Sequence, residues 1–327
     1  MTSSKERTII NIVNPVCYSE WLAGLLRHGL LRSSFIPPKE VRIWRDLTRM
    51  RRKYVNSMSD YKKRVQKLFE SANIKIDSVV SDLFGVTGSN LMSLLASGHT
   101  DITMADIEQC VRGRLKSKTR ELHRSIKGFF SDHHRYLLQT LLSTIASLKD
   151  TIESLDQRIS SLMRNHEELI ERMKEVPGIS EISARDIIAE IGTTLDAFPS
   201  DAELASWSGL CPGNNESAGK RKSGKNHTWK NHLKPVMTEV AWAAARTKNT
   251  YYQNKFHRLK TRRGHNKAII AIAHKIIKCL YCIIKKGACY KESGTEYLDQ
   301  ITKKTKLNRL HKQAESLGFQ LIPVTMQ

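Results

Sequence analysis

Residues 138–173, "LQTLLSTIASLKDTIESLDQRISSLMRNHEELIERM", decide the fold, because apolar side chains recur alternately three and four residues apart throughout them. Neither proline nor glycine interrupts the stretch. A sustained repeat of about 3.5 residues with charged flanks is typical of a coiled coil. Eleven positions form its seam, and His166 is the only polar one: Leu138, Leu141, Ile145, Leu148, Ile152, Leu155, Ile159, Leu162, His166, Leu169 and Met173.

The seam can be covered in two ways, by a second chain or by another helix of the same chain. One long helix in a bundle core shows the same pattern over shorter lengths, so the five unbroken heptads favour a coiled coil. We assign the coiled coil to residues 119–175 and expect a homo-oligomer through it. His166 is expected to be a register-fixing or partly solvated residue of the seam rather than to bind a ligand.

The residues before the seam predict one further long helix. Residues 39–73 place apolar side chains on one face and cations on the others, and the prolines of "SFIPP", residues 34–38, cannot continue a helix across that boundary. Short helices are expected over residues 74–117, broken at Gly85, Gly88, Gly98 and Gly113. Residues 1–38 combine a β-prone piece, "RTIINIVNP", with an apolar helical piece, "SEWLAGLLRHGLL".

The residues after the seam predict a group of shorter helices. Pro177-Gly178 ends one helix, and Ser183 to Ile191 forms the next, with Gly192 as its cap. This turn partly resembles a helix-hairpin-helix element, whose amides hold a phosphate, although a plain helix connection fits equally well. Residues 203–287 predict a helix, a Gly/Asn/Ser-rich loop and three basic helices. The fold class is therefore mainly α, and the tail after Gly294 shows no periodicity.

Charge is the strongest compositional feature of the 327-residue chain, whose formal net charge is +22. Eighteen Lys or Arg residues and one acid, Glu239, lie between Lys220 and Lys286, and eleven cations and three acids lie between Lys39 and Lys67. Such surfaces favour a polyanion, since each cation placed on a phosphate releases counterions. Nucleic acid is favoured over a membrane, because no basic amphipathic stripe with an aromatic face is present.

The chain shows no secretory signal and no apolar stretch long enough to cross a bilayer. Its six cysteines form no regular framework. We therefore expect a cytoplasmic protein with reduced thiols and no membrane partner.

Residues 207–225, "WSGLCPGNNESAGKRKSGK", carry a resemblance to a known family, together with "VPGI" and "EIG" upstream and "RRGHNKAIIAIAHKI" downstream. In this order the motifs resemble the C-terminal domain of bacterial insertion-sequence transposases of the 110/116/902 type. The resemblance implies DNA transposition, a coiled coil between two end domains and, in some members, a structured guide RNA. It also implies an N-terminal nuclease domain of ribonuclease-H-like fold, in which four acids hold Mg²⁺.

One departure from the family concerns that nuclease domain. Family members carry a "TDxxDA" acidic pair just before "EWLA", whereas this chain reads "NIVNPVCYSEWLA", with Tyr18 in place of the last Asp. The first two acids would lie upstream of Met1. The expected organisation is a nuclease remnant (1–38), a basic helical connector (39–118), the coiled coil (119–175), a serine-containing transposase domain (176–297) and a tail (298–327). No cofactor is expected in this chain itself.

Ser217 in "ESAG" is the candidate catalytic residue, since the resemblance implies a serine that joins covalently to DNA. Its hydroxyl needs a base and stabilisation of the developing charge, and Glu216 is a possible base without assured reach. Composition alone favours a flexible basic loop; the ordered family motifs favour the nucleophile. The expected nucleic-acid contacts are Gly178, Gly213, Gly219, Lys220, Arg221, Lys222, Lys225, Arg262, Arg263 and Lys267.

Two functions from different classes follow. The first is a DNA-binding transposase in which Ser217 forms a covalent DNA link and which cuts poorly alone, because the metal-binding acids are missing. The second is a non-catalytic nucleic-acid-binding remnant that occupies element ends or guide RNA, or inhibits an intact transposase. A third reading is a decayed element whose product is unstable.

Overall fold

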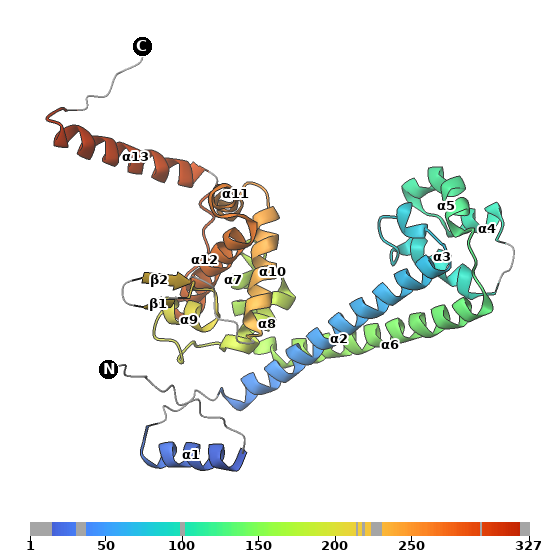
Figure 1. Ribbon diagram of the computed structural model, residues 1–327, viewed down its shortest axis with the longest axis horizontal. Helices are drawn as coiled ribbons and strands as arrows, with labels where there is room; N and C mark the ends of the chain where they lie inside the picture. The colour runs from blue at the N-terminus through green and yellow to red at the C-terminus, as the bar shows by residue number, and fades with distance from the viewer. Residues whose placement is uncertain are drawn as a thin grey trace, which may run out of the picture. The chain divides into compact units, whose positions relative to one another are not determined.

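The computed structural model describes residues 15–30, 37–98, 102–213, 215–217, 220–223, 231–294 and 296–320. It forms two compact units, Met1–Pro38 and Lys39–Gln327. The described part is mainly α, as predicted, and contains one small β-hairpin (Figure 1). The first unit holds α1 (Pro15–Arg27), where the apolar helical piece was expected, whereas nearly all of "RTIINIVNP" lies outside the described residues.

The second unit contains the remaining elements in chain order. They are α2 (Lys39–Ser71), η1 (Ile76–Ser78), α3 (Val86–Ala96), α4 (Met104–Cys110), η2 (Gly113–Lys118), α5 (Thr119–Ile126), α6 (Asp132–Leu162), η3 (Arg164–His166), α7 (Glu167–Lys174), α8 (Glu181–Ile191), α9 (Asp201–Trp207), β1 (Asn215–Ser217), β2 (Lys220–Ser223), α10 (Leu233–Arg246), α11 (Tyr251–Arg263), α12 (His265–Lys286) and α13 (Glu296–Ser316). Over the described residues, no helix is long and apolar enough to span a membrane.

The long helix predicted from residue 39 is α2, and it lies along α6 in the opposite direction (Figure 1). Arg51, near the start of α2, pairs with Asp156, near the end of α6. Val65, near the end of α2, shares a buried cluster with Leu138, near the start of α6. The seam of α6 is thus covered by a helix of the same chain, which was one of the two alternatives left open.

The seam does not continue as one helix to Met173. The α-helix ends at Leu162, and η3 separates it from α7. The reason is that α2, which covers the seam, begins only at Lys39. Val41 and Trp44, near the start of α2, are therefore the last apolar side chains of α2 that the seam meets as it runs toward Leu162. Beyond them the chain packs into a core instead of along a helix. His166 meets the Trp44 ring edge-on, with centroids 5.2 Å apart, which agrees with a packing role.

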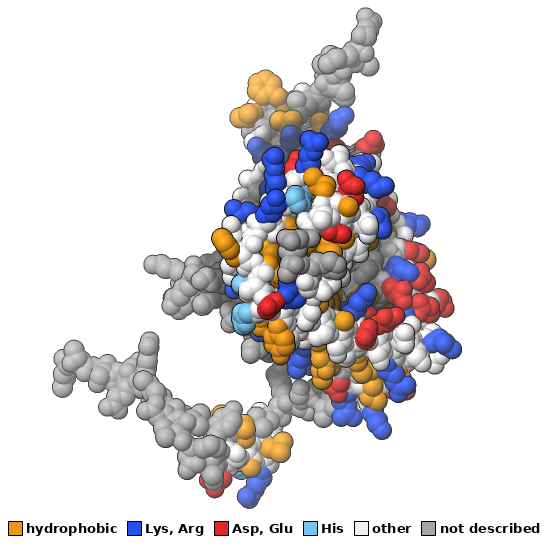
Figure 2. Space-filling view, turned by 90° about the vertical axis from the view of Figure 1, so that its right-hand side faces the viewer, with side chains coloured by type: hydrophobic (Ala, Val, Ile, Leu, Met, Phe, Trp, Pro, Cys, Tyr) orange, Lys and Arg blue, Asp and Glu red, His pale blue; other side chains and the backbone are white. Residues whose placement is uncertain are grey.

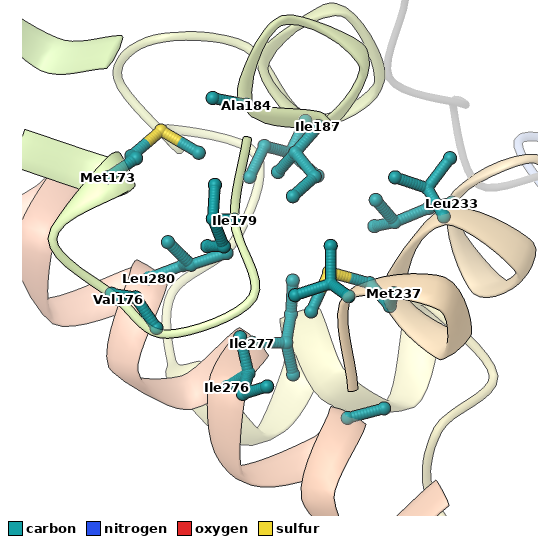
Figure 3. Close-up of a cluster of buried hydrophobic side chains, with 14 of the residues drawn as sticks. Met173, Val176, Ile179, Ala184, Ile187, Leu233, Met237, Ile276, Ile277 and Leu280 are labelled. Atoms are coloured by element: carbon teal, nitrogen blue, oxygen red, sulfur yellow. The ribbon is translucent and has the colours of Figure 1, made fainter. Parts of the chain in front are cut away.

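Two hydrophobic cores lie in the second unit. The α3–α5 core gathers buried side chains from the end of α2, from α3 to α5 and from the start of α6, with Leu91, Ile107 and Leu122 fully buried. The α7–α12 core gathers the start of α2, the end of α6 and the helices from α7 to α12. Figure 3 shows its side chains converging from α7, α8, α10 and α12. The helix pair α2–α6 contributes to both cores.

The glycine positions correct one prediction. Gly85 caps the start of α3, and Gly98 and Gly113 also lie at or beyond helix ends, but Gly88 lies inside α3. A Cβ at Gly88 would come well within 3.0 Å of the Leu83 carbonyl. Gly88 is therefore required for close packing of two backbone segments and does not break the helix.

The C-terminal tail, in which the sequence shows no periodicity, forms the helix α13 over residues 296–316. The segment has neither proline nor glycine and is rich in strong helix formers, although it lacks a regular apolar stripe. Leu298 is buried, and Arg258 of α11 donates to the Leu298 carbonyl over 3.1 Å and pairs with Asp299. Docking of the first turn on α11 anchors the helix.

Candidate nucleic-acid interface

The segment that carries Ser217 is a short antiparallel hairpin. Its register places Ser217 directly opposite Lys220, and Glu216 opposite Arg221. Asn215 pairs with Ser223, so Lys222 is the extra residue of a β-bulge. The backbone thus brings the candidate nucleophile next to the predicted cations. Side chains of the hairpin, together with Gly219 and Lys225, lie outside the described residues.

The base of the hairpin segment is closed by Asn231. Its side-chain amide donates to the Trp207 carbonyl at the end of α9 over 2.7 Å, and its side-chain oxygen accepts from the Leu233 backbone N–H over 2.8 Å. Leu210 and Leu233 are buried in the α7–α12 core, while Gly213 is half-buried between Leu210 and β1. Both ends of the loop are therefore fixed on a rigid core.

Sequence reasoning did not identify Asn231. The available signal was an Asn just before a helix, where its side chain commonly accepts a hydrogen bond from a backbone N–H two residues further on. That pattern identifies the turn. The contact with Trp207 joins residues 24 positions apart, and only the fold reveals it.

Gly178 lies in the turn between α7 and α8 with φ of +89°. A Cβ there would lie well within 3.0 Å of the Val240 carbonyl and the Ala244 amide of α10. The turn therefore packs against the backbone of α10, and the glycine is required both for its left-handed conformation and for this close approach. A capping box between Ser180 and Ser183 begins α8.

The predicted contacts Arg262, Arg263 and Lys267 lie around Gly264, where α11 ends and α12 begins. All three side chains are exposed, and none has an ion-pair partner among the described residues. Burial lowers the pKa of Lys255 on α11, and three neighbouring cations lower it further: Lys275, Arg258 and Arg262. This end of α11 and α12 is a region of positive potential suited to phosphate groups.

Acids from outside the basic block 220–286 neutralise part of it. Asp299 pairs with Arg258, Asp201 with Lys278 over 3.0 Å, and Asp196 with Lys285 over 3.2 Å. Glu239 is the block's own acid, and it pairs with Arg52 of α2. The acid within the block therefore bonds to a cation outside it, and the charge around Gly264 is left uncompensated.

The second cationic cluster, residues 39–67, serves the fold more than sequence reasoning suggested. Arg45 donates to the Ala189 carbonyl over 2.9 Å and to that of Glu190, at the end of α8. Arg49 makes two 2.8 Å hydrogen bonds with the buried Glu190 carboxylate. Arg51 pairs with Asp156 and Arg52 with Glu239. These four arginines join α2 to α6, α8 and α10, and three acids offset most of their charge: Glu190, Asp156 and Glu239.

Asp186 on α8 lies in this junction and lines a pocket of about 240 Å³ with Arg49, Arg52 and His232. Burial raises its pKa to about 6, against the opposing influence of Arg51 and Arg52. A carboxyl group with such a pKa in a polar pocket is a functional-site candidate as well as a structural one. Nothing in the sequence distinguished Asp186 from other acids on helices.

Two tryptophans in or near the basic block, whose rings could stack on bases, are half-buried and pack against neighbouring rings. Trp242 contacts His265, with ring centroids 4.5 Å apart, and Trp207 meets Phe198 at 5.2 Å. Trp229 lies outside the described residues. Within the described ranges, no group of three or more His, Cys, Asp or Glu residues could hold a metal ion. The Mg²⁺ that the family resemblance implies thus finds no ligand set there, and no step below involves it.

The fold and the basic surface define a mainly α-helical protein with uncompensated positive charge at its C-terminal helices. Residues 170–258 match the model of the transposase family IS116/IS110/IS902. This match runs from within α7 to within α11 and includes the serine hairpin, and it supports a function in DNA transposition. No curated protein matches the chain.

Proposed function

We propose that the chain takes part in DNA transposition through a covalent link between Ser217 and a DNA phosphate. Ser217 Oγ gives its proton to a base and forms a bond to phosphorus. The bond from phosphorus to the departing strand oxygen breaks, and that oxygen takes up a proton. Nearby cations stabilise the charge of the pentacoordinate transition state.

The observation that carries the proposal is the hairpin register within the matched family segment. Ser217 pairs with Lys220, and the next pair is Glu216 with Arg221. Family match and register together favour a role for this serine over that of a serine on an arbitrary basic loop. Lys220, Arg221, Lys222 and Lys225 then serve the scissile phosphate, while Arg262, Arg263 and Lys267 hold the flanking strand.

The test is trapping on a suicide DNA substrate that carries the element ends. We expect a protein–DNA adduct that survives denaturation and that Ser217→Ala abolishes, with Ser223→Ala as the matched serine control. A nicking assay follows the same samples. Adduct formation that Ser217→Ala leaves intact would refute the assignment.

The proposal includes weak cleavage by this chain alone, since "VCYS" replaces the family's acidic pair before "EWLA". Robust strand transfer by the isolated chain would contradict it. The second candidate is a non-catalytic module that binds element ends or guide RNA. Salt-sensitive binding that is unaffected by Ser217→Ala, without any adduct, favours the module.

DNA is the primary partner in this proposal, with a structured guide RNA as a second one. Self-association is also part of it. Leu148 and Leu155 of α6 are only half-buried by α2, so the helix pair leaves apolar surface for another copy. Sedimentation of the full chain tests this. A monomer at all concentrations would contradict it.

A further inference from the structure

A pocket at the α3–α5 core lies outside the matched segment 170–258 and has no role in the proposal above. Its volume is about 680 Å³, within the roughly 300–1,000 Å³ typical of ligand sites. We define the Phe129 pocket by its lining residues: Asn73, Leu95, Ile102, His123, Ile126, Lys127, Gly128, Phe129, Phe130 and Arg135.

Phe129 is held with its ring in solvent. Its side chain is 83% exposed, whereas the neighbouring Phe130 is half-buried and packs toward Phe69 at 6.3 Å between centroids. The Phe129 backbone N–H donates to the Ala72 carbonyl over 2.8 Å. A Cβ at Gly128 would collide with that carbonyl, so the backbone is tightly seated. An aromatic ring on an anchored backbone is a preformed stacking surface.

The pocket is cationic. Among the described residues, its lining includes Lys127, Arg135 and His123, and none of the described lining residues is an acid. The chain from Arg112 to Arg135 carries eight Lys or Arg residues and two acids. Figure 2, seen from the side where α3, α4 and α5 lie in Figure 1, shows hydrophobic side chains among cations and histidines; acids are scattered over this face and densest toward one edge. The charge complements an anionic partner.

Arg135 adds a cation to the lining of the pocket. Its side chain is 17% exposed and pairs with Asp132 through Nη1. Its Nε–H is buried and has no acceptor in the described structure, as is also true of Arg172 and Arg185. The remaining guanidinium N–H groups of Arg135 are the donors that a ligand oxygen would use.

We propose that the Phe129 pocket binds an unpaired nucleotide of a nucleic-acid strand. The base stacks on Phe129 against the apolar wall formed by Leu95 and Ile126. A phosphate or base oxygen accepts from Arg135, and Lys127 meets the flanking phosphate. This requires an unstacked base, because a paired duplex presents no free base face. The inference does not depend on Ser217.

The test compares a fluorescent oligo(dT) strand with a duplex of the same length, using anisotropy on the full chain. Measurements are made at raised salt, where the purely electrostatic contribution of other basic surfaces is reduced. We expect Phe129→Ala to weaken strand binding about tenfold and to leave duplex binding unchanged. Phe129→Trp should retain strand affinity, and Phe319→Ala, an exposed aromatic outside the pocket, should have no effect.

A further variant separates stacking from charge. Lys127→Ala should lower the salt dependence of strand binding. Because Phe129 is so exposed, its alanine variant should keep the wild-type Tm. Binding of oligo(rU), measured in parallel with oligo(dT), tells whether the strand is RNA or DNA. A preference for either ribose or deoxyribose supports the site.

Equal loss of strand and duplex binding in Phe129→Ala would overturn the proposal, and so would no loss at all. If that variant instead abolished self-association while strand affinity persisted, the pocket would be a protein contact and the proposal wrong. A photocrosslink from 5-iodouracil in the strand should map to the peptide containing Phe129. Crosslinks found only within the block 220–286 would also contradict the proposal.

Discussion

At the scale of single residues, positions with similar sequence signals have different physical roles. Gly178 and Gly264 each separate two helices and each has a positive φ, +89° and +80°. The space around the two glycines differs. A Cβ at Gly178 would collide with α10, whereas a Cβ at Gly264 would have no neighbouring atom within 4 Å. The sequence therefore locates both turns but does not rank their tolerance.

Gly178→Ala should destabilise the protein by more than 3 kcal/mol, because backbone strain is added to a collision with the α10 backbone. Gly264→Ala meets only the strain and should cost about 1 kcal/mol. Urea unfolding followed by circular dichroism measures both. Equal losses in the two variants would show that α10 moves away to accommodate the methyl group.

Asp186 should make stability depend on pH, because its folded pKa is raised to about 6. A raised carboxyl pKa means that the folded state holds the proton more tightly, so this group's contribution to stability falls as pH rises through about 6. Four charged groups act on it: Arg51, Arg52, Glu239 and Asp156.

Asp186→Asn should therefore stabilise the protein at pH 7.5, by no more than about 3 kcal/mol, and the gain should shrink as pH falls toward about 4. Denaturant unfolding at several pH values, compared with wild type, measures it. Asp150→Asn, at an exposed position of α6, is the control and should show no such trend. A gain that is independent of pH would contradict the assignment.

At the scale of elements, α2 is held to its neighbours by arginines as much as by apolar contacts. Arg45 bonds to carbonyls at the end of α8, and Arg49 forms a bidentate pair with Glu190. The end of α8 thus receives the cations that its unsatisfied carbonyls and helix dipole favour. Four of the eleven cations that suggest a polyanion-binding surface on residues 39–67 therefore connect α2 to neighbouring helices.

Arg49→Ala should lower the free energy of unfolding by about 2 kcal/mol or more, because it removes two hydrogen bonds from a buried carboxylate. Lys63→Ala on the same helix breaks an exposed pair with Asp60 and should cost less than about 1 kcal/mol. Chemical denaturation of both variants measures the two losses in the free energy of unfolding. A loss in Arg49→Ala as small as in the control would show that Arg45 alone satisfies Glu190.

At the scale of the whole molecule, the second unit has two cores that both draw side chains from α2 and α6. Their remaining side chains come from different helices: α3 to α5 in one core and α7 to α12 in the other. Regions that share few buried contacts can unfold separately, so the two cores should differ in local stability.

Leu122→Ala and Met237→Ala remove fully buried side chains from the α3–α5 core and the α7–α12 core respectively, each at a cost of about 2–5 kcal/mol. We expect Leu122→Ala to accelerate amide exchange in α3 to α5 while α10 and α12 stay protected, and Met237→Ala to do the reverse. Hydrogen-exchange mass spectrometry resolves the two regions. Faster exchange throughout the unit in either variant would mean that α2 and α6 unite both cores.

The sequence by itself determined the mainly α fold, the long helices and the helix boundaries at Gly192 and Gly264, because periodicity and capping are local signals. It also predicted the transposase relationship that the match over residues 170–258 supports. The roles of Ser217 and of its surrounding cations stay predictions, since hairpin register alone does not test chemistry.

Only the tertiary structure decided which helix covers the α6 seam, why the seam stops at Leu162, and which cations are neutralised. The pairs Arg51–Asp156 and Arg49–Glu190 join residues 105 and 141 positions apart. The residues next to each partner in the sequence do not reveal such contacts, because the energy of a charge or an aromatic ring depends on its burial and its partners. For the same reason, two adjacent phenylalanines look alike in the sequence, yet the fold packs Phe130, half-buried, toward Phe69 and leaves Phe129 in solvent.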